Sequence, residues 1–166
     1  ADGHIVSPIF HEISDDVFKK IKSDSNFLFV DPQGFLRQKD SNGNVILKKT
    51  DLDLSDVNAI KINPEEGQNI VSGSHDEMML ALQKKGIEYV LLTNKVDVSL
   101  LVKNRVYSLK LPNKTVHDTT GIGDIFCSAF TCTMLKEKDF LWALCFAAGS
   151  AQAALESNNV GLQKIP

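Results

Sequence analysis

The sequence predicts an α/β domain in which helices cover both faces of a mostly parallel β-sheet. Strand-like and helix-like segments alternate along most of the chain, and this alternation is typical of layered α/β folds. Residues 27–30 and 89–93 are unbroken apolar runs, as expected for strands that are buried on both faces. The 166 residues, 43% of them hydrophobic, are enough for one domain with a substantial core.

The first part of the chain is expected to form short strands separated by turns and helices. Ser14 is expected to cap a helix with carboxylates in its first turn, and Pro64 suits the first turn of another helix. Residues 31–34 (Asp-Pro-Gln-Gly) and 42–43 (Asn-Gly) are turn signals. The expected strands of this part are residues 4–7, 27–30, 45–47 and 59–62.

The second part of the chain contains longer elements. Ser74 and Glu77 have the spacing of a capping box, which predicts a helix over residues 75–85 that ends near Gly86. The other expected elements are a strand at 89–93, a hairpin within 96–110 that turns at Lys103 and Asn104, a helix through Met134, and a last helix capped by Asp139.

Composition and charge argue against several classes of protein. The formal net charge is -3, so no general basic field is available to attract a nucleic acid. No apolar run approaches the roughly 20 residues of a membrane span, and residues 1–10 lack the layout of a signal peptide. Cys127, Cys132 and Cys145 lie in apolar segments without CxxC spacing, which predicts buried, reduced thiols in a cytoplasmic protein.

Residues 118–126, Asp-Thr-Thr-Gly-Ile-Gly-Asp-Ile-Phe, are the segment that points to chemistry. Two glycines flank one residue where a loop becomes a helix, so the backbone can turn freely and approach a ligand closely. The free N–H groups at the start of a helix form a site suited to phosphate. A carboxylate beside an anion is costly unless it accepts a proton from a substrate hydroxyl. The alternative is a plain helix cap with a flexible turn.

This segment resembles the second signature of the PfkB family of sugar and nucleoside kinases, Asp-Thr-Thr-Gly-Ala-Gly-Asp-x-Phe, with Ile122 in place of the alanine. The resemblance implies a three-layer ribokinase-like fold. It implies that Asp124 is the catalytic base that deprotonates the acceptor hydroxyl. It also implies that the backbone of Gly121, Ile122 and Gly123 holds the charge of the phosphate.

The resemblance extends to residues that would hold metal ions. Asn63 and Glu66 match the family's Asn-x-x-Glu element, which implies that they organise Mg2+ through its waters near the phosphates of ATP. A solvated acidic first helical turn is the alternative interpretation. Asp118 and Thr120 stand where some members bind a monovalent cation, which implies a K+ site.

The nucleotide-binding features of the family match less closely. Thr93 ends a strand where the family has Thr-x-Gly-x-x-Gly, but residues 93–97 read Thr-Asn-Lys-Val-Asp, without glycines. The Ala-rich helix that includes Ser150 resembles the helix that forms one wall of the family's adenine pocket. Many members carry asparagine at the position of Ser150, and plain helix packing is an equally good interpretation of the small residues.

The resemblance covers residues 1–166 as a single, incomplete ribokinase-like domain, the C-terminal half of a family member. It implies an ATP-dependent phosphotransferase acting on a hydroxyl of a sugar or nucleoside, with weak activity or none in this half alone. A sheet cut through its middle exposes an edge strand, so we expect pairing with the missing N-terminal half, or a homo-oligomer. Neither nucleic acid nor membrane is an expected partner.

Two other functions remain open from the sequence. The altered stretch at 93–97 favours a nucleotide-binding or interaction module that kept the fold and lost turnover. The remaining alternative is an unrelated α/β enzyme in which the Gly-x-Gly-Asp turn at 121–124 is a coincidence.

Overall fold

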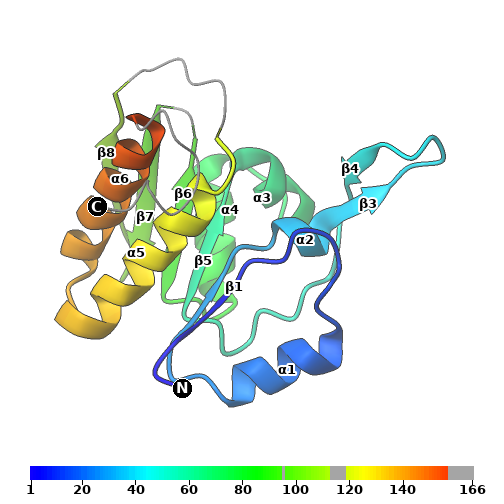
Figure 1. Ribbon diagram of the computed structural model, residues 1–166, viewed down its shortest axis with the longest axis horizontal. Helices are drawn as coiled ribbons and strands as arrows, with labels where there is room; N and C mark the ends of the chain where they lie inside the picture. Colours follow the sequence, from blue (N-terminus) through cyan, green and yellow to red (C-terminus); the bar gives the residue numbers. More distant parts are fainter. Residues whose placement is uncertain (95, 113–118, 157–166) are drawn as a thin grey trace.

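The chain folds into three layers, with one sheet between two sets of helices (Figure 1). The computed structural model describes residues 1–94, 96–112 and 119–156. Helices α1, α3 and α4 contribute to the hydrophobic core on one face of the sheet, and α5 and α6 contribute to the core on the other. This arrangement confirms the predicted α/β fold.

The main sheet has the strand order β1-β2-β5-β6-β7-β8. The first four strands pair in parallel, and the last two continue the sheet antiparallel. Lys103 and Asn104 both have positive φ, as a tight hairpin turn requires, and this confirms the predicted hairpin. The strands are β1 (His4–Val6), β2 (Leu28–Val30), β5 (Ala59–Ile62), β6 (Tyr89–Thr93), β7 (Asp97–Val102) and β8 (Arg105–Lys110).

Side-chain caps fix the starts of three helices. Ser14 caps α1, and full capping boxes form between Asn63 and Glu66 at α3 and between Ser74 and Glu77 at α4. The prediction of a helix over 75–85 is therefore confirmed to within one residue. The helices are α1 (Asp15–Ser23), α2 (Gln33–Leu36), α3 (Pro64–Ile70), α4 (His75–Lys84), α5 (Ile122–Glu137) and α6 (Phe140–Glu156).

The Asp-Pro-Gln-Gly segment at 31–34 is not the simple turn that its composition predicts. It leads into the four-residue helix α2, which is followed by a small hairpin of β3 (Arg37–Lys39) and β4 (Val45–Leu47). This hairpin projects from the body of the molecule (Figure 1). The turn predicted at Asn42 and Gly43 lies at its tip, and Gly43 has φ 83°.

The two cores follow from the alternation of side chains along each strand. In β5, Ile60 and Ile62 join the core on one face and Ala59 joins the core on the other. Phe29 of β2 meets Phe130 of α5 edge to face, with ring centroids 5.6 Å apart. The sheet is therefore anchored to α5, the helix that carries the predicted catalytic residue.

None of the helices in the described part of the chain combines the length and apolar character needed to cross a bilayer. The expectation of buried thiols is right only for Cys127, because Cys132 and Cys145 are exposed.

Candidate functional site

The site lies at the edge of the sheet where the parallel strands end. Ser7 follows β1, Asp31 follows β2, Asn63 follows β5, and Thr93 is the last residue of β6. Because parallel strands place their carboxyl ends at one edge, these four residues, distant in sequence, lie in a row along that edge. Ligands of open α/β sheets bind outside this edge.

The first turn of α5 begins at the same edge. Gly121 precedes the helix with φ 77° and ψ -4°, a left-handed conformation that glycine adopts without steric cost. The amide of Ile125 donates to the Gly121 carbonyl at 3.0 Å, whereas the amide of Ile122 donates to the Thr119 carbonyl at 3.3 Å. The amides of a first helical turn are suited to an anion, but that of Ile122 would first have to leave the Thr119 carbonyl.

The carboxylate of Asp124 is exposed in this first turn. The hydroxyl of Ser7 donates to Asp124 Oδ1 at 2.7 Å, across 117 positions of sequence. Sequence analysis missed Ser7, because nothing in its own surroundings marks it. The hydrogen bond orients an otherwise exposed carboxylate at the entrance of the predicted anion site.

A buried ion pair lies beside the same turn. Lys61 Nζ is 2.7 Å from Asp31 Oδ2, and the two side chains are only 10% and 8% exposed. Burial by itself would lower the pKa of Lys61, but the charges of Asp31 and then Glu66 outweigh it and raise that pKa above its ordinary value. Sequence analysis also missed Lys61, although a lysine within an apolar strand requires a partner.

Asn63 and Glu66 are held together by a capping box. The Asn63 amide donates to Glu66 Oε2 at 2.9 Å, and the Glu66 amide donates to Asn63 Oδ1 at 2.8 Å. Glu66 is only 1% exposed, so the alternative of a solvated acidic turn is wrong for this residue. Burial is the largest influence on Glu66 and raises its pKa above the ordinary value, against the opposing charge of Lys61.

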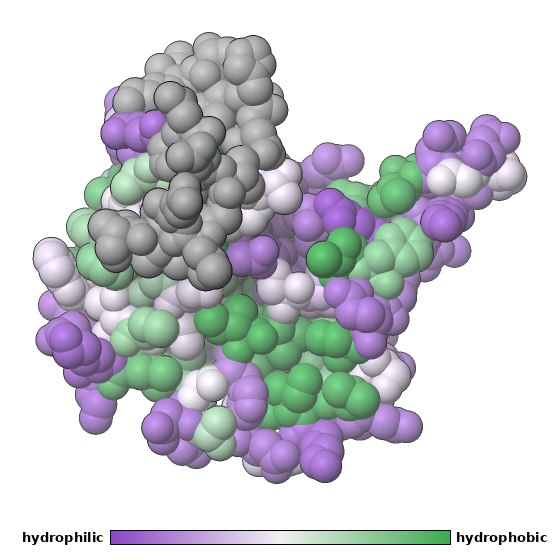
Figure 2. All heavy atoms as spheres, viewed as in Figure 1, coloured by the Kyte–Doolittle hydropathy of each residue, from purple (hydrophilic) through white to green (hydrophobic). Residues whose placement is uncertain are grey.

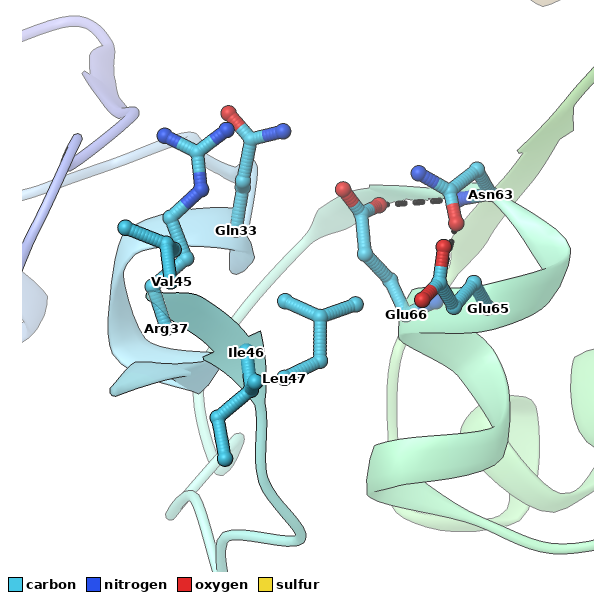
Figure 3. Close-up of a pocket in the computed structure, with 8 residues that line it drawn as sticks. All are labelled: Gln33, Arg37, Val45, Ile46, Leu47, Asn63, Glu65 and Glu66. Carbon is cyan, nitrogen blue, oxygen red and sulfur yellow. Dashed lines mark hydrogen bonds between the residues drawn. The ribbon is translucent and has the colours of Figure 1, made fainter. Parts of the chain in front are cut away.

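A cavity of about 480 Å³ separates the base of the projecting hairpin from the start of α3. Figure 3 shows Arg37 and Gln33 on one side of it and the hydrogen-bonded pair of Asn63 and Glu66 on the other. Arg37 donates to the Ile9 carbonyl at 3.2 Å, which fixes its guanidinium. The cavity is lined by Gln33, Arg37, Val45, Ile46, Leu47, Asn63, Glu65 and Glu66.

Thr93 lies beside Asn63, and the next residue, Asn94, forms hydrogen bonds with residues close to it in the sequence. The Thr93 hydroxyl donates to the Ile62 carbonyl at 3.4 Å, which places it beside Asn63. The amides of Val96 and Asp97 both donate to Asn94 Oδ1 at 2.8 Å, and the Asn94 amide donates to the Asp97 carbonyl at 3.0 Å. Hydrogen bonds between Asn94 and residues 96 and 97 therefore stand where the family has a glycine-rich stretch.

The remaining predicted site residues are Ser150, Thr120 and Asp118, and the structure describes the first two. Ser150 is half-buried in the third turn of α6. Thr120 is exposed and precedes Gly121 directly. Asp118 lies outside the described residues, so the K+ site stays a prediction.

The oxygen-bearing side chains near the start of α3 can be compared with what a Mg2+ ion requires. Among the described residues, no group of three or more His, Cys, Asp or Glu side chains could hold a metal ion. Mg2+ in phosphoryl-transfer sites needs only one or two protein carboxylates, because water and substrate phosphates complete its octahedron. The capping box already uses Glu66 Oε2 and one lone pair of Asn63 Oδ1, so the other oxygen of Glu66 and the second lone pair of Asn63 Oδ1 are the acceptors that fit a water-bridged ion.

The layered fold, with its site at the carboxyl edge of the sheet, is that of the ribokinase-like kinases. A pyrophosphate-dependent kinase in the ribokinase family, solved with a pyrophosphate analog and myo-inositol, matches with TM-score 0.83 at 18% identity, over 96% of this chain and 60% of its own. A ribokinase from Thermotoga maritima matches with TM-score 0.76 at 18% identity, over 100% of this chain and 54% of its own.

An adenosine kinase from Schistosoma mansoni matches with TM-score 0.74 at 14% identity, over 98% of this chain and 52% of its own. The chain thus spans a little over half the length of these proteins. The pfkB family of carbohydrate kinases matches residues 33–166, and the chain belongs to that family. No curated protein sequence matches it.

Proposed function

We propose that this chain carries the phosphoryl-transfer site of a kinase that moves the terminal phosphate of a donor to a hydroxyl of a sugar, cyclic polyol or nucleoside. One observation carries the proposal: the exposed carboxylate of Asp124, held by Ser7, lies in the first turn of α5 beside backbone amides suited to phosphate. A base next to an anion site is the minimum for attack of an alcohol on a phosphate.

The proposed reaction assigns each group one task. Asp124 accepts the proton of the acceptor hydroxyl as that oxygen bonds to the terminal phosphorus, while the bond from phosphorus to the bridging oxygen breaks and its electrons leave with the remaining phosphate. The amides of Gly123 and its neighbours stabilise the charge on the transferred group. When bound, Mg2+ would neutralise donor phosphate charge, and Asn63 and Glu66 would hold its waters.

The donor is either ATP or pyrophosphate. Family membership and the small residues of α6 favour ATP. The hydrogen bonds of Asn94 with Val96 and Asp97 favour pyrophosphate, because they stand where the family has the glycine-rich stretch that lines a nucleotide. The structural likeness to a pyrophosphate-dependent kinase is consistent with either donor, since fold alone does not determine chemistry.

The test is a transfer assay on the full-length protein that contains this chain. Ribose, fructose, myo-inositol and adenosine are offered as acceptors, each with ATP, ADP or pyrophosphate and with Mg2+. Phosphorylation of one acceptor would establish the kinase and name its donor. Donor binding without transfer to any acceptor would contradict the proposal and favour a binding module that has lost turnover.

A further inference from the structure

The ion pair between Asp31 and Lys61 is buried where the proposed reaction takes place. It links the end of β2 to the middle of β5, and its two side chains are 8% and 10% exposed. Placing two charges in a protein interior costs several kcal/mol per ion. Well-packed apolar residues are often as stabilising as such a pair, so stability is a weak explanation for it.

The pair lies directly against the first turn of α5. A Cβ atom built on Gly123 would lie 3.5 Å from Asp31 Oδ2, 3.5 Å from Lys61 Cε and 3.6 Å from Lys61 Nζ. Because Gly123 has no side chain, its backbone faces both charges of the pair. Gly123 is also the residue whose amide is proposed to bind the phosphate.

The two charges would have opposite effects on a bound phosphate. An unpaired carboxylate at Asp31 would repel it, and the water-poor surroundings would weaken that repulsion less than bulk water does. Lys61 cancels this charge from 2.7 Å away. Glu66 lies within the electrostatic reach of Lys61 as well, so a second carboxylate near the site depends on the same cation.

We propose that Lys61 is a positioning residue that neutralises Asp31 beneath the first turn of α5 and thereby allows the donor phosphate to bind there. The inference rests on the proposed function, because it assigns a role to the same anion site. Lys61 acts through Asp31 and the backbone of Gly123, without touching the phosphate.

A purely structural role makes a different prediction. If the ion pair only stabilises the packing of β2 against β5, loss of either partner destabilises the same edge of the sheet. Both variants should then bind the donor more weakly and unfold at a lower temperature. If charge balance is the role, removing Lys61 and removing the charge of Asp31 change donor affinity in opposite directions.

The test compares four variants of the full-length protein: K61M, D31N, the double variant D31N/K61M and the conservative K61R. Titration calorimetry measures the dissociation constants of ATP with Mg2+ and of pyrophosphate with Mg2+, and thermal unfolding is followed in parallel. We expect K61M to weaken donor binding about tenfold or more, as one unopposed charge near an anion warrants. D31N should bind the donor as tightly as the unaltered protein or more tightly.

The double variant and K61R keep the inference falsifiable if the single variants fail to fold. D31N/K61M removes both charges, and K61R keeps the pair, so each should bind the donor within about threefold of the unaltered protein. Weakening by tenfold or more in a folded double variant, or equal weakening in K61M and D31N, would overturn the role of Lys61 and leave the kinase standing. Absence of donor binding by the unaltered protein would overturn the proposed function and this inference together.

Discussion

Asp124 is exposed, and one hydroxyl holds its carboxylate in place. The donor of that hydrogen bond is Ser7, at the end of the strand β1. A carboxylate that accepts a proton must also point at the acceptor, because catalysis depends on holding the reacting groups in line. Ser7 is therefore expected to influence turnover without binding the substrate that donates the phosphate.

Replacing Ser7 with alanine tests this influence. A hydrogen bond to a charged group contributes about 1.5–3 kcal/mol, so kcat of Ser7→Ala should fall about tenfold or more with little change in the KM for the donor. Steady-state kinetics on the full-length protein measures both constants. Ser128→Ala, on the exposed surface of α5, is the control, and an unchanged kcat in Ser7→Ala would contradict the positioning of Asp124.

At the site, the sequence predicts residues within motifs better than residues that act across the fold. Asp124 and Gly121 belong to one continuous string, and Asn63 and Glu66 are three positions apart, so pattern and spacing can single them out as candidates. Ser7 reaches Asp124 across 117 positions, and Lys61 meets a turn more than sixty residues away. Such contacts depend on strand order, which no local pattern specifies.

The short helix α2 shows how a contact between elements determines local structure. A Cβ built on Gly34 would overlap the carbonyl oxygen of Pro8, an impossible approach. The His11 amide also donates to the Gly34 carbonyl at 3.1 Å. The glycine is therefore required by the segment after β1 and not by a turn, which is why the composition of 31–34 gave the wrong local prediction.

Gly34→Ala should accordingly destabilise the fold. The atom it meets belongs to the backbone and cannot rotate away, so we expect a loss of about 1–3 kcal/mol in the free energy of unfolding, the usual cost of overpacking. Urea unfolding followed by circular dichroism measures it.

Gly149→Ala in α6 is the matched control for this change. Among the residues that the structure describes, none lies within 4 Å of a Cβ at Gly149, so alanine there should raise stability by about 0.5–1 kcal/mol, the helix preference of alanine over glycine. Equal effects of the two substitutions would refute the steric explanation for Gly34.

Helices with side-chain caps are the elements that the sequence predicts best. The capping box of Ser74 and Glu77 is a local interaction, and the helix that it starts ends within one residue of its predicted end. The hairpin at Lys103 and Asn104 is local in the same way. Parallel pairing of β1, β2, β5 and β6 is nonlocal, and only the general rule for alternating strands and helices predicts it.

β1 is an edge strand of the main sheet. Figure 2 shows apolar residues gathered on the face that carries β1, between α5 and α1. Large apolar residues exposed on these three elements are Ile5, Val17 and Leu135. Free strand edges and apolar surface favour association with another chain.

We therefore predict that the 166-residue chain, studied alone, associates with itself. Multi-angle light scattering across a concentration series measures the mass. Ile5→Lys, which places a charge on the edge strand, should shift the distribution toward monomer. A monodisperse monomer at every concentration in the unaltered chain would contradict the prediction.

The central claim is that Asp124 is the base of a phosphoryl-transfer site, and its most direct test is the Asp124→Asn variant of the full-length protein. Amide and carboxylate have the same shape, so we predict that kcat falls about a hundredfold or more while calorimetry still detects donor binding. Asp16→Asn, the same change in the first turn of α1, should leave both unchanged. Transfer at the original rate by Asp124→Asn would contradict the claim.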